Sequence, residues 1–175
     1  ARELDPANAH LLINRGLLYL DLAEAQDAAL VFSEALEIDS ENDLIREYLL
    51  EALSQVDTEG LRSYIKFFDN FLPDSVKALE NLSNFYINIE HFERAIEVRR
   101  SLVVREPDNA HHLFILAHAH DISGDKIAAF ELYKKAVDIN NTMSGAYYNL
   151  ALISANWDDY ANAEKFYLLA LDAEP

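Results

Sequence analysis

The spacing of the prolines is the feature that most constrains how this 175-residue chain can fold. Pro73 and Pro107 are 34 apart in the sequence, Pro107 and Pro175 are 68 apart, and Pro6 precedes Pro73 by 67. A period of 34 residues, with one single-residue deletion between Pro6 and Pro73, therefore accounts for the positions of all four prolines. A fixed period of this length indicates stacked supersecondary units rather than one irregular globular core.

Each period contains two helical patterns separated by a short turn. In the first period, a polar turn around Glu24 divides two stripes with the spacing of a helix face. Glycine and proline are scarce, with four of each in the chain, which disfavours β-hairpins and glycine-rich phosphate loops. The first stripe contains Leu12, Gly16 and Tyr19, and the second contains Ala28, Phe32 and Ala35.

This order of residues resembles the tetratricopeptide repeat family. Its pattern is a large residue, a small one and an aromatic on the first helix, followed by Ala, an aromatic, Ala and Pro. The fourth unit departs from it where His120 replaces the aromatic and Asn141 the proline. The resemblance covers the whole chain and implies an all-α fold, a right-handed α-solenoid of five helix–turn–helix repeats. The fifth unit matches the pattern with Tyr147, Ala151, Ala163, Tyr167, Ala170 and Pro175.

The period also predicts where the repeats begin and end. Residues 1–8 are expected to form the end of an upstream repeat, namely the last turn of its second helix and the exit loop. Because stable arrays usually end in a polar cap and none follows the last proline, we expect a fragment of a longer protein. The repeats are predicted at 9–42, 43–75, 76–109, 110–143 and 144–175.

The second repeat departs most from the pattern. It carries the deletion, which we expect in the turn near Asp57, and large residues occupy positions where small ones are usual. Its two helices are therefore expected to sit farther apart or at a different angle. The apolar run at 64–72 has two interpretations: an exposed partner site, or phenylalanines that fill the core. The large residues are Leu50, Leu61 and Phe68, and the phenylalanines are Phe67, Phe68 and Phe71.

The charge balance narrows the range of partners. The chain has 31 acidic and 14 basic residues and a net charge of −17, so it repels nucleic acids and anionic membranes. No apolar run reaches the roughly 20 residues that cross a bilayer, which argues against membrane insertion. The acidity either serves only to keep the exterior solvated or also attracts basic partners.

The sequence contains none of the usual motifs for catalysis or cofactor binding. Cysteine, HExxH and phosphate-binding glycine motifs are all absent. His111 and His118 are two helical turns apart, about 10 Å, which is too far for one ion. His118 and Asp121 could share an ion, but two ligands make a weak site. We therefore predict no enzymatic activity, no cofactor and no metal site.

The family resemblance implies that the first helix of each repeat lines a concave, peptide-binding face. This face is expected to be apolar at both ends and acidic in the middle, with Lys77 as the one cation that can be placed there. A partner that is apolar and basic would suit it. The predicted site residues are Ile13, Asn14, Leu17, Glu47, Glu51, Lys77, Glu80, Asn81, Asn84, Phe114, His118, Asp121, Tyr148, Asn149 and Leu152.

Two binding devices of the family can be compared with this face. The basic clamp that holds acidic chaperone tails is disfavoured, because only Lys77 fits a charged role and the tail would meet Glu47, Glu51 and Glu80. A ladder of asparagines, which can bond an extended peptide, is partly present. The alternative is that these amides bond neighbouring helices. The ladder column holds Asn14, Asn81 and Asn149, interrupted by Tyr48 and Ile115.

The leading hypothesis for function is a scaffold that binds a peptide or a partner protein on the concave face. The alternative is a regulatory or substrate-recruiting region of a larger enzyme whose catalytic domain lies outside this chain. Self-association through the ends of the array is a third hypothesis. The family serves cytoplasmic, organellar and periplasmic assemblies, so the resemblance leaves the compartment open.

Overall fold

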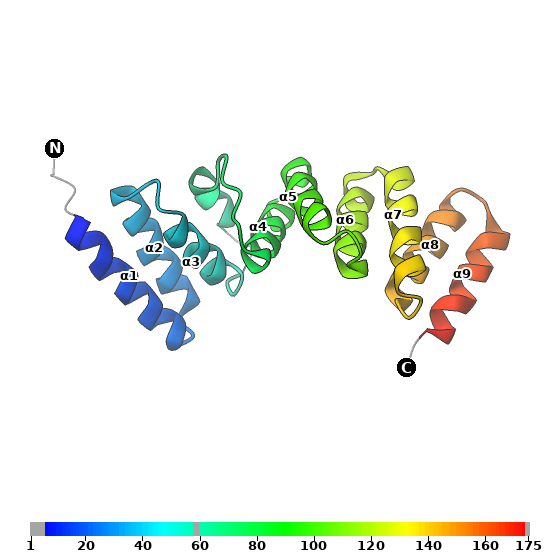
Figure 1. Cartoon of the computed structure of the whole chain (residues 1–175), viewed down its shortest axis with the longest axis horizontal. Coiled ribbons are helices and arrows are strands. Elements are labelled where there is room, and N and C mark those ends of the chain that lie inside the picture. Colours follow the sequence, from blue (N-terminus) through cyan, green and yellow to red (C-terminus); the bar gives the residue numbers. More distant parts are fainter. Residues whose placement is uncertain (1–5, 58–59, 174–175) are drawn as a thin grey trace. The chain divides into compact units, whose positions relative to one another are not determined.

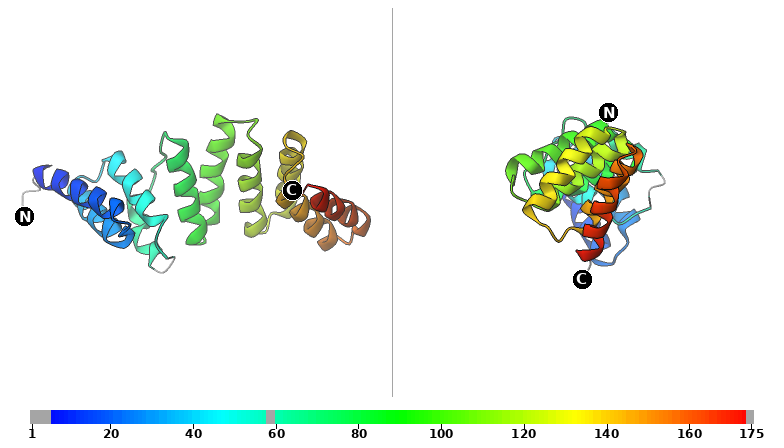
Figure 2. Two further views of the ribbon diagram at one scale, coloured as in Figure 1. Left: turned by 90° about the horizontal axis from the view of Figure 1, so that it is seen from below. Right: turned by 90° about the vertical axis from the view of Figure 1, so that its right-hand side faces the viewer.

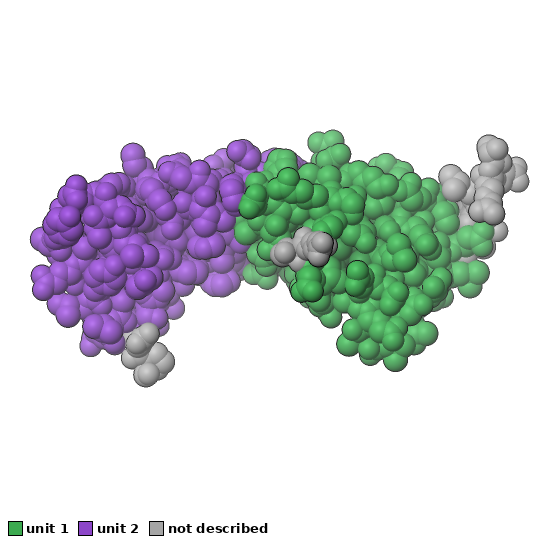
Figure 3. Space-filling model, turned by 180° about the vertical axis from the view of Figure 1, so that it is seen from behind, with its two compact units in different colours: residues 1–91 green, residues 92–175 purple. Residues whose placement is uncertain are grey.

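The computed structural model describes residues 6–57 and 60–173, and it divides the chain into two compact units, 1–91 and 92–175 (Figure 3). All regular structure in the described residues is helical, which confirms the all-α class of helical repeats (Figure 1). The first unit contains α1 (Pro6–Asp21), α2 (Ala25–Ile38), α3 (Asp43–Leu53), the 3-10 helix η1 (Leu61–Phe67) and α4 (Val76–Asn88). The second unit contains α5 (Phe92–Arg105), α6 (Ala110–Ser123), α7 (Lys126–Ile139), α8 (Ser144–Asn156) and α9 (Tyr160–Asp172).

The boundaries differ from the predicted repeats in two places. Residues 6–8, expected in an exit loop, form the first turn of α1, while residues 1–5 of the same segment lie outside the described residues. The predicted repeat at 76–109 contributes α4 to the first unit and α5 to the second.

The same tight turn follows four of the helices. Ala23, Glu90, Gly124 and Asp158 all have positive φ, between 59° and 95°, and the last three are spaced by one repeat period. After each of them, the next N–H bonds to the carbonyl five residues back, as Asp125 N does to His120 O at 2.9 Å. This is a Schellman-type ending, in which a left-handed residue lets the chain reverse direction. The sequence period is therefore also a backbone period.

The first hairpin depends on a glycine. Gly16 of α1 is buried, and a Cβ at this position would lie 2.5 Å from Phe32 Cε1 of α2. Phe32 is itself fully buried, between Ala28 and Ala35 one turn to either side. Close approach of α1 and α2 therefore requires the absence of a side chain at Gly16.

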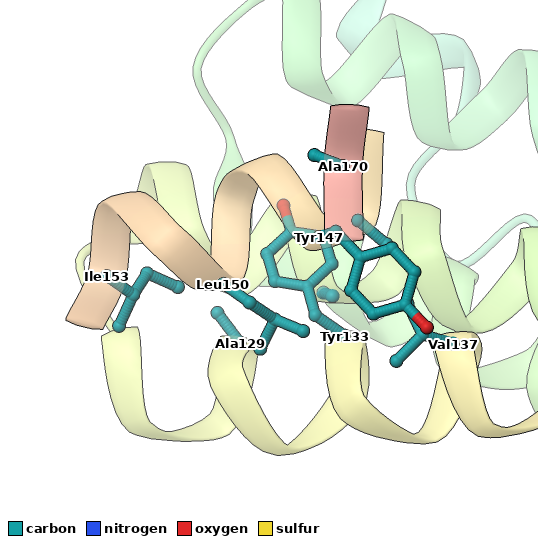
Figure 4. Packing of buried hydrophobic residues seen from close by; sticks show 9 residues of the cluster. Ala129, Tyr133, Val137, Tyr147, Leu150, Ile153 and Ala170 are labelled. Carbon is teal, nitrogen blue, oxygen red and sulfur yellow. The ribbon is translucent and has the colours of Figure 1, made fainter. Parts of the chain in front are cut away.

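In the second unit, α8 packs on α7 through one continuous cluster. Figure 4 shows Leu150 and Ile153 of α8 lying over α7, with Leu150 close to Ala129. Tyr133 of α7 is completely buried, and Tyr147 of α8 lies beside it. The hairpin is completed by α9, which lies side by side with α8 (Figures 1 and 2).

The second repeat does not contain two α-helices. Its first helix, α3, ends at Leu53, and the expected second helix is replaced by the 3-10 helix η1 and an irregular segment up to Pro73. The prediction of a second α-helix, displaced or re-angled, was therefore wrong. Leu50, Leu61 and Phe68 are each at most 1% exposed, so three large side chains fill the space where two α-helices would otherwise touch.

The phenylalanines of this segment belong mainly to the core. Phe68 is fully buried and Phe71 is 5% exposed, whereas Phe67 is half-buried with the Lys66 amine 4.6 Å from its ring centroid. Phe68 meets Phe85 of α4 edge-on, with ring centroids 4.8 Å apart. The core-filling interpretation of this run is confirmed for Phe68 and Phe71.

Two side chains hold the irregular segment in place. Arg46 of α3 donates from Nε to Phe67 O (2.9 Å) and from Nη2 to Ser40 O (2.5 Å). Its guanidinium also lies over the Phe71 ring, 5.4 Å from the centroid. From the other side, the Tyr86 hydroxyl of α4 donates to Phe68 O (3.1 Å). The bonds to Phe67 O and Phe68 O satisfy backbone carbonyls that a regular helix would satisfy internally.

Candidate partner-binding surfaces

The fifteen predicted site residues lie on α1, α3, α4, α6 and α8, and none of them is fully buried. Nine belong to the first unit and six to the second, so they form surfaces of two separate units. Their exposure on the first helices is compatible with a binding role.

In the first unit, the structure brings four predicted residues together in a cleft between α3 and α4. We call Glu47, Glu51, Lys77 and Asn81 the acidic cleft. Its volume is about 160 Å³, and its remaining lining comes from Tyr48, Ser75 and Ala78. The other predicted residues of this unit lie outside the cleft lining. They are Ile13, Asn14 and Leu17 on α1, and Glu80 and Asn84 on α4.

An ion pair spans the acidic cleft. Lys77 Nζ lies 2.6 Å from Glu51 Oε1, and both side chains are substantially exposed (71% and 37%). Glu51 is in the last turn of α3 and Lys77 in the first turn of α4, so each charge sits at the helix end whose dipole disfavours it. An exposed pair contributes little to stability, typically below about 1 kcal/mol. The placement of these charges is therefore poorly explained by folding alone.

Tyr48 lines the cleft, although the sequence placed it only in the ladder column. Its ring stacks on Phe32 of α2 with centroids 5.5 Å apart and an interplanar angle of 26°. The sequence could have indicated this position, because Tyr48 stands one repeat period after Asn14 on a first helix. In the structure, this helix, α3, packs against α2 of the preceding hairpin. Tyr48 therefore forms an aromatic wall of the acidic cleft.

In the second unit, the predicted residues on α6 and α8 include three with apolar or aromatic side chains, Phe114, Tyr148 and Leu152. Tyr148 and Leu152 are 51% and 38% exposed, and Phe114 is half-buried. Phe114 pairs with Tyr133 of α7 at 5.6 Å, and Tyr148 pairs with Tyr167 of α9 at 5.8 Å. The exposure of Tyr148 and Leu152 is compatible with the predicted apolar end of a binding face, which stays a prediction.

Two of the polar predicted residues on α6 lie beside charged groups of the same unit. Asp121 Oδ1 pairs with Lys126 Nζ at 2.6 Å. Burial lowers the pKa of His118, and the positive charge of Arg99 lowers it further. Arg99 itself is 5% exposed and donates from Nη1 to Ile115 O at 2.5 Å. Within the described residues, no three His, Asp or Glu side chains are grouped so that they could hold a metal ion.

The asparagine column is used in different ways in the two units. Asn149 Nδ2 of α8 donates to the Tyr133 hydroxyl of α7 at 3.0 Å, so this amide bonds a neighbouring helix. Asn14 is exposed, and Asn81 is half-buried in the acidic cleft. Burial raises the pKa of Tyr133, which therefore remains a neutral hydroxyl and accepts this bond. The packing alternative holds for Asn149.

Comparison with known proteins agrees with the repeat pattern. The tetratricopeptide repeat model matches residues 9–42, 111–143 and 144–175, which is more than half of the chain. The chain belongs to the tetratricopeptide repeat family. A search of curated proteins found no significant match. In the described residues, no helix of this tetratricopeptide repeat protein is long and apolar enough to cross a membrane.

Solved structures share the fold at low sequence identity. A structure of MamA from Desulfovibrio magneticus RS-1 is 18% identical, with a TM-score of 0.75 over 95% of this chain and 94% of that one. YrrB, described as a tetratricopeptide repeat protein with an unusual peptide-binding site, is 17% identical, with a TM-score of 0.77 over 99% and 89%. Another MamA crystal structure is 19% identical, with a TM-score of 0.76 over 95% and 92%.

Proposed function

We propose that this protein-interaction scaffold binds a partner segment that is both basic and apolar, on the exposed sides of its first helices. The acidic cleft is the observation that carries this proposal. It presents Glu47 and Glu51 beside the aromatic Tyr48, and Lys77 is the single cation in its lining. A basic side chain of the partner would replace Lys77 at Glu51, while an apolar neighbour would contact Tyr48.

The net charge of −17 supports the same choice of partner. A strongly negative surface attracts cationic segments over distances of about one Debye length, roughly 8–10 Å at physiological ionic strength. Such attraction mainly raises the association rate, and salt weakens it. YrrB, which shares this fold and is described as having an unusual peptide-binding site, supports the choice of a peptide as partner.

A charge-reversal experiment tests the acidic cleft. The chain is screened on a peptide array, and the best basic-apolar peptide is titrated against wild type and Glu47→Lys/Glu51→Lys. The matched control is Asp138→Lys/Glu164→Lys, which makes the same change in net charge at exposed positions of α7 and α9. We expect at least about tenfold weaker binding for the cleft variant and a smaller, salt-dependent change for the control. A preference for acidic peptides, or equal losses in both variants, would contradict the proposal.

The alternative is that the repeats recruit substrate for a catalytic domain elsewhere in a longer polypeptide. It would use the same surfaces, and we propose that the chain itself binds and does not catalyse. The sequence of the complete gene product distinguishes the two: a catalytic domain beside the repeats would favour recruitment.

Self-association through the ends of the array is a separate hypothesis, because it does not involve the acidic cleft. Sedimentation of the chain over a range of concentrations tests it, and a constant molecular mass would contradict it.

A further inference from the structure

The acidic cleft contains a cation of its own chain, the amine of Lys77. Lys77 Nζ lies 2.6 Å from Glu51 Oε1, and it reaches this carboxylate from α4, on the other side of the cleft. The cleft volume of about 160 Å³ is the space of roughly five water molecules, which suits one long side chain. The structure therefore shows how an amine is bound in this cleft.

The repeat architecture does not require a lysine at this position. Two repeat periods after Lys77, at the same place on α8, the chain has Gly145. A Cβ on Gly145 would lie 3.7 Å from the Phe114 ring of α6, so this position faces the preceding first helix in the second unit as well. Because α6 and α8 pack without a side chain there, helix packing does not account for the presence of Lys77.

Lys77 neutralises only one of the two carboxylates that line the cleft. Glu47 stands one turn before Glu51 on α3, and both side chains are half-buried in the cleft lining. Within the described part of the chain, the one ion pair of the cleft joins Lys77 to Glu51. A partner's cation can therefore bind at Glu47 while Lys77 stays in place, whereas binding at both carboxylates requires Lys77 to leave Glu51.

The departure of Lys77 from Glu51 costs little free energy. The Lys77 side chain is 71% exposed, and solvent screens an ion pair of this kind. Holding a long lysine side chain in one rotamer also costs entropy, which is regained when it is released. In addition, Lys77 is in the first turn of α4, where the positive end of the helix dipole disfavours a cation. Lys77 is therefore a replaceable occupant of the cleft.

We propose that Lys77 is an internal competitor of the partner, which occupies Glu51 in the free protein and limits the affinity of the acidic cleft for segments with two basic side chains. This inference rests on the proposed function of the cleft. A segment with one basic side chain pairs with Glu47 and leaves Lys77 in place. A segment with two basic side chains displaces Lys77 and pairs with both carboxylates, so its binding is the one that Lys77 weakens most.

The test compares wild type with Lys77→Met, which keeps the apolar stem of the side chain and removes its charge. Three labelled peptides share one glycine–serine frame with a leucine, and they carry two lysines, one lysine and one glutamine, or two glutamines. Their binding to the 175-residue chain is followed by fluorescence anisotropy. We expect Lys77→Met to tighten binding of the two-lysine peptide by about three- to fivefold and of the one-lysine peptide by less than about twofold.

Two further variants separate competition at Glu51 from a change in net charge. Lys66→Met is the matched control, because Lys66 of η1 is 60% exposed and pairs with Glu37 outside the cleft. It should change binding of the two-lysine peptide by no more than about 1.5-fold. Lys77→Met/Glu51→Gln should bind this peptide no more tightly than wild type, because the released carboxylate is missing. Urea unfolding of Lys77→Met should give the wild-type midpoint, since the exposed pair contributes little to stability.

The possible results distinguish this inference from the proposed function. A preference for the lysine peptides without tighter binding by Lys77→Met, or equal tightening by Lys66→Met, would reject the competitor role and leave the proposed function standing. A lower urea midpoint for Lys77→Met would also reject it, because Lys77 would then be a structural contact between α3 and α4. Equal affinities of all three peptides for wild type and Lys77→Met would contradict the proposed function of the cleft, and the competitor role with it.

Discussion

The α3–η1 segment of the first unit and the α6–α7 hairpin of the second occupy equivalent places in the repeat pattern but fold differently. In α6–α7 the close-contact positions are Ala117, Ala129 and Ala136, all 0% exposed, and two α-helices pack directly together. In the α3–η1 segment the corresponding residues are Leu50, Leu61 and Phe68. Large side chains at these three positions exclude the direct helix–helix contact that the alanines allow in α6–α7.

The irregular segment needs polar anchors that the regular hairpin does not. Arg46 occupies the position at which α6 has Leu113, a large apolar residue of the repeat pattern. Its side chain is only 14% exposed, and it bonds two backbone carbonyls outside α3. The second repeat therefore replaces the packing of two α-helices with an aromatic cluster fixed by an arginine and a tyrosine.

Removing the centre of the aromatic cluster should have the largest effect. We expect Phe68→Ala to destabilise the first unit by about 3–5 kcal/mol, because a fully buried ring leaves a cavity. Hydrogen exchange followed by mass spectrometry should show lost protection in α3 and α4 while α6–α9 keep theirs. Phe67→Ala, at the half-buried neighbour, is the matched control. Equal loss of protection in both units would contradict this localisation.

The sequence predicted the regular helical hairpins well. Periodic small residues and the proline spacing were sufficient for the helical class and for the exposed first-helix residues, because both follow from local spacing. They were not sufficient for η1, since the same large residues allow either a displaced α-helix or a non-helical segment. The difference depends on contacts such as Arg46 to Phe67 O, between residues 21 positions apart.

The candidate site was predictable to a similar degree. Helical spacing placed Glu47, Glu51 and Lys77 on exposed sides of first helices. It could not show that Lys77 reaches Glu51, because that contact depends on how α3 and α4 pack. The exposure of Leu171 on α9 was not predicted, because α9 matches the repeat pattern; Leu171 is 67% exposed, whereas Val137 at the equivalent position of α7 is 7% exposed.

The second-largest effect is expected at the arginine anchor. Arg46→Leu restores the apolar residue of the repeat pattern, yet we expect it to destabilise the first unit by about 2–3 kcal/mol, because two backbone carbonyls lose a charged donor. Arg62→Leu is the control: Arg62 forms an exposed pair with Glu90 at 3.5 Å, so its loss should cost below about 1 kcal/mol. Urea unfolding with a first-unit probe measures both. Stabilisation by Arg46→Leu would show that the segment becomes more regular without its anchor.

Substitutions at two equivalent turns, one in each unit, should have smaller effects on stability, and these two effects should be opposite in sign. Gly124→Ala should destabilise the α6–α7 turn by about 1 kcal/mol, since φ is +95° and an L-residue is strained there although no atom lies within 4 Å of its Cβ. Ala23→Gly, at the α1–α2 turn with φ of 59°, should stabilise by a comparable amount. Thermal unfolding of the two variants and of the double variant measures the effects. Changes of the same sign would contradict a purely conformational origin.

The smallest expected effect is a pH dependence of stability that comes from His118. Because His118 lies on α6, this dependence should appear in the regular hairpin and not in the irregular segment. Burial and the charge of Arg99 lower the pKa of His118 in the folded chain below its ordinary value of 6.5. The unfolded chain therefore takes up the proton first, so stability is fully present above about pH 6.5 and falls as the pH drops through the folded value. His118→Gln should remove this dependence, which differential scanning of wild type and variant from pH 8 to pH 5 would measure. Because His118 is partly exposed, the difference should be small and confined to unfolding of the second unit. An equal acid response in the variant would assign the sensitivity to other groups.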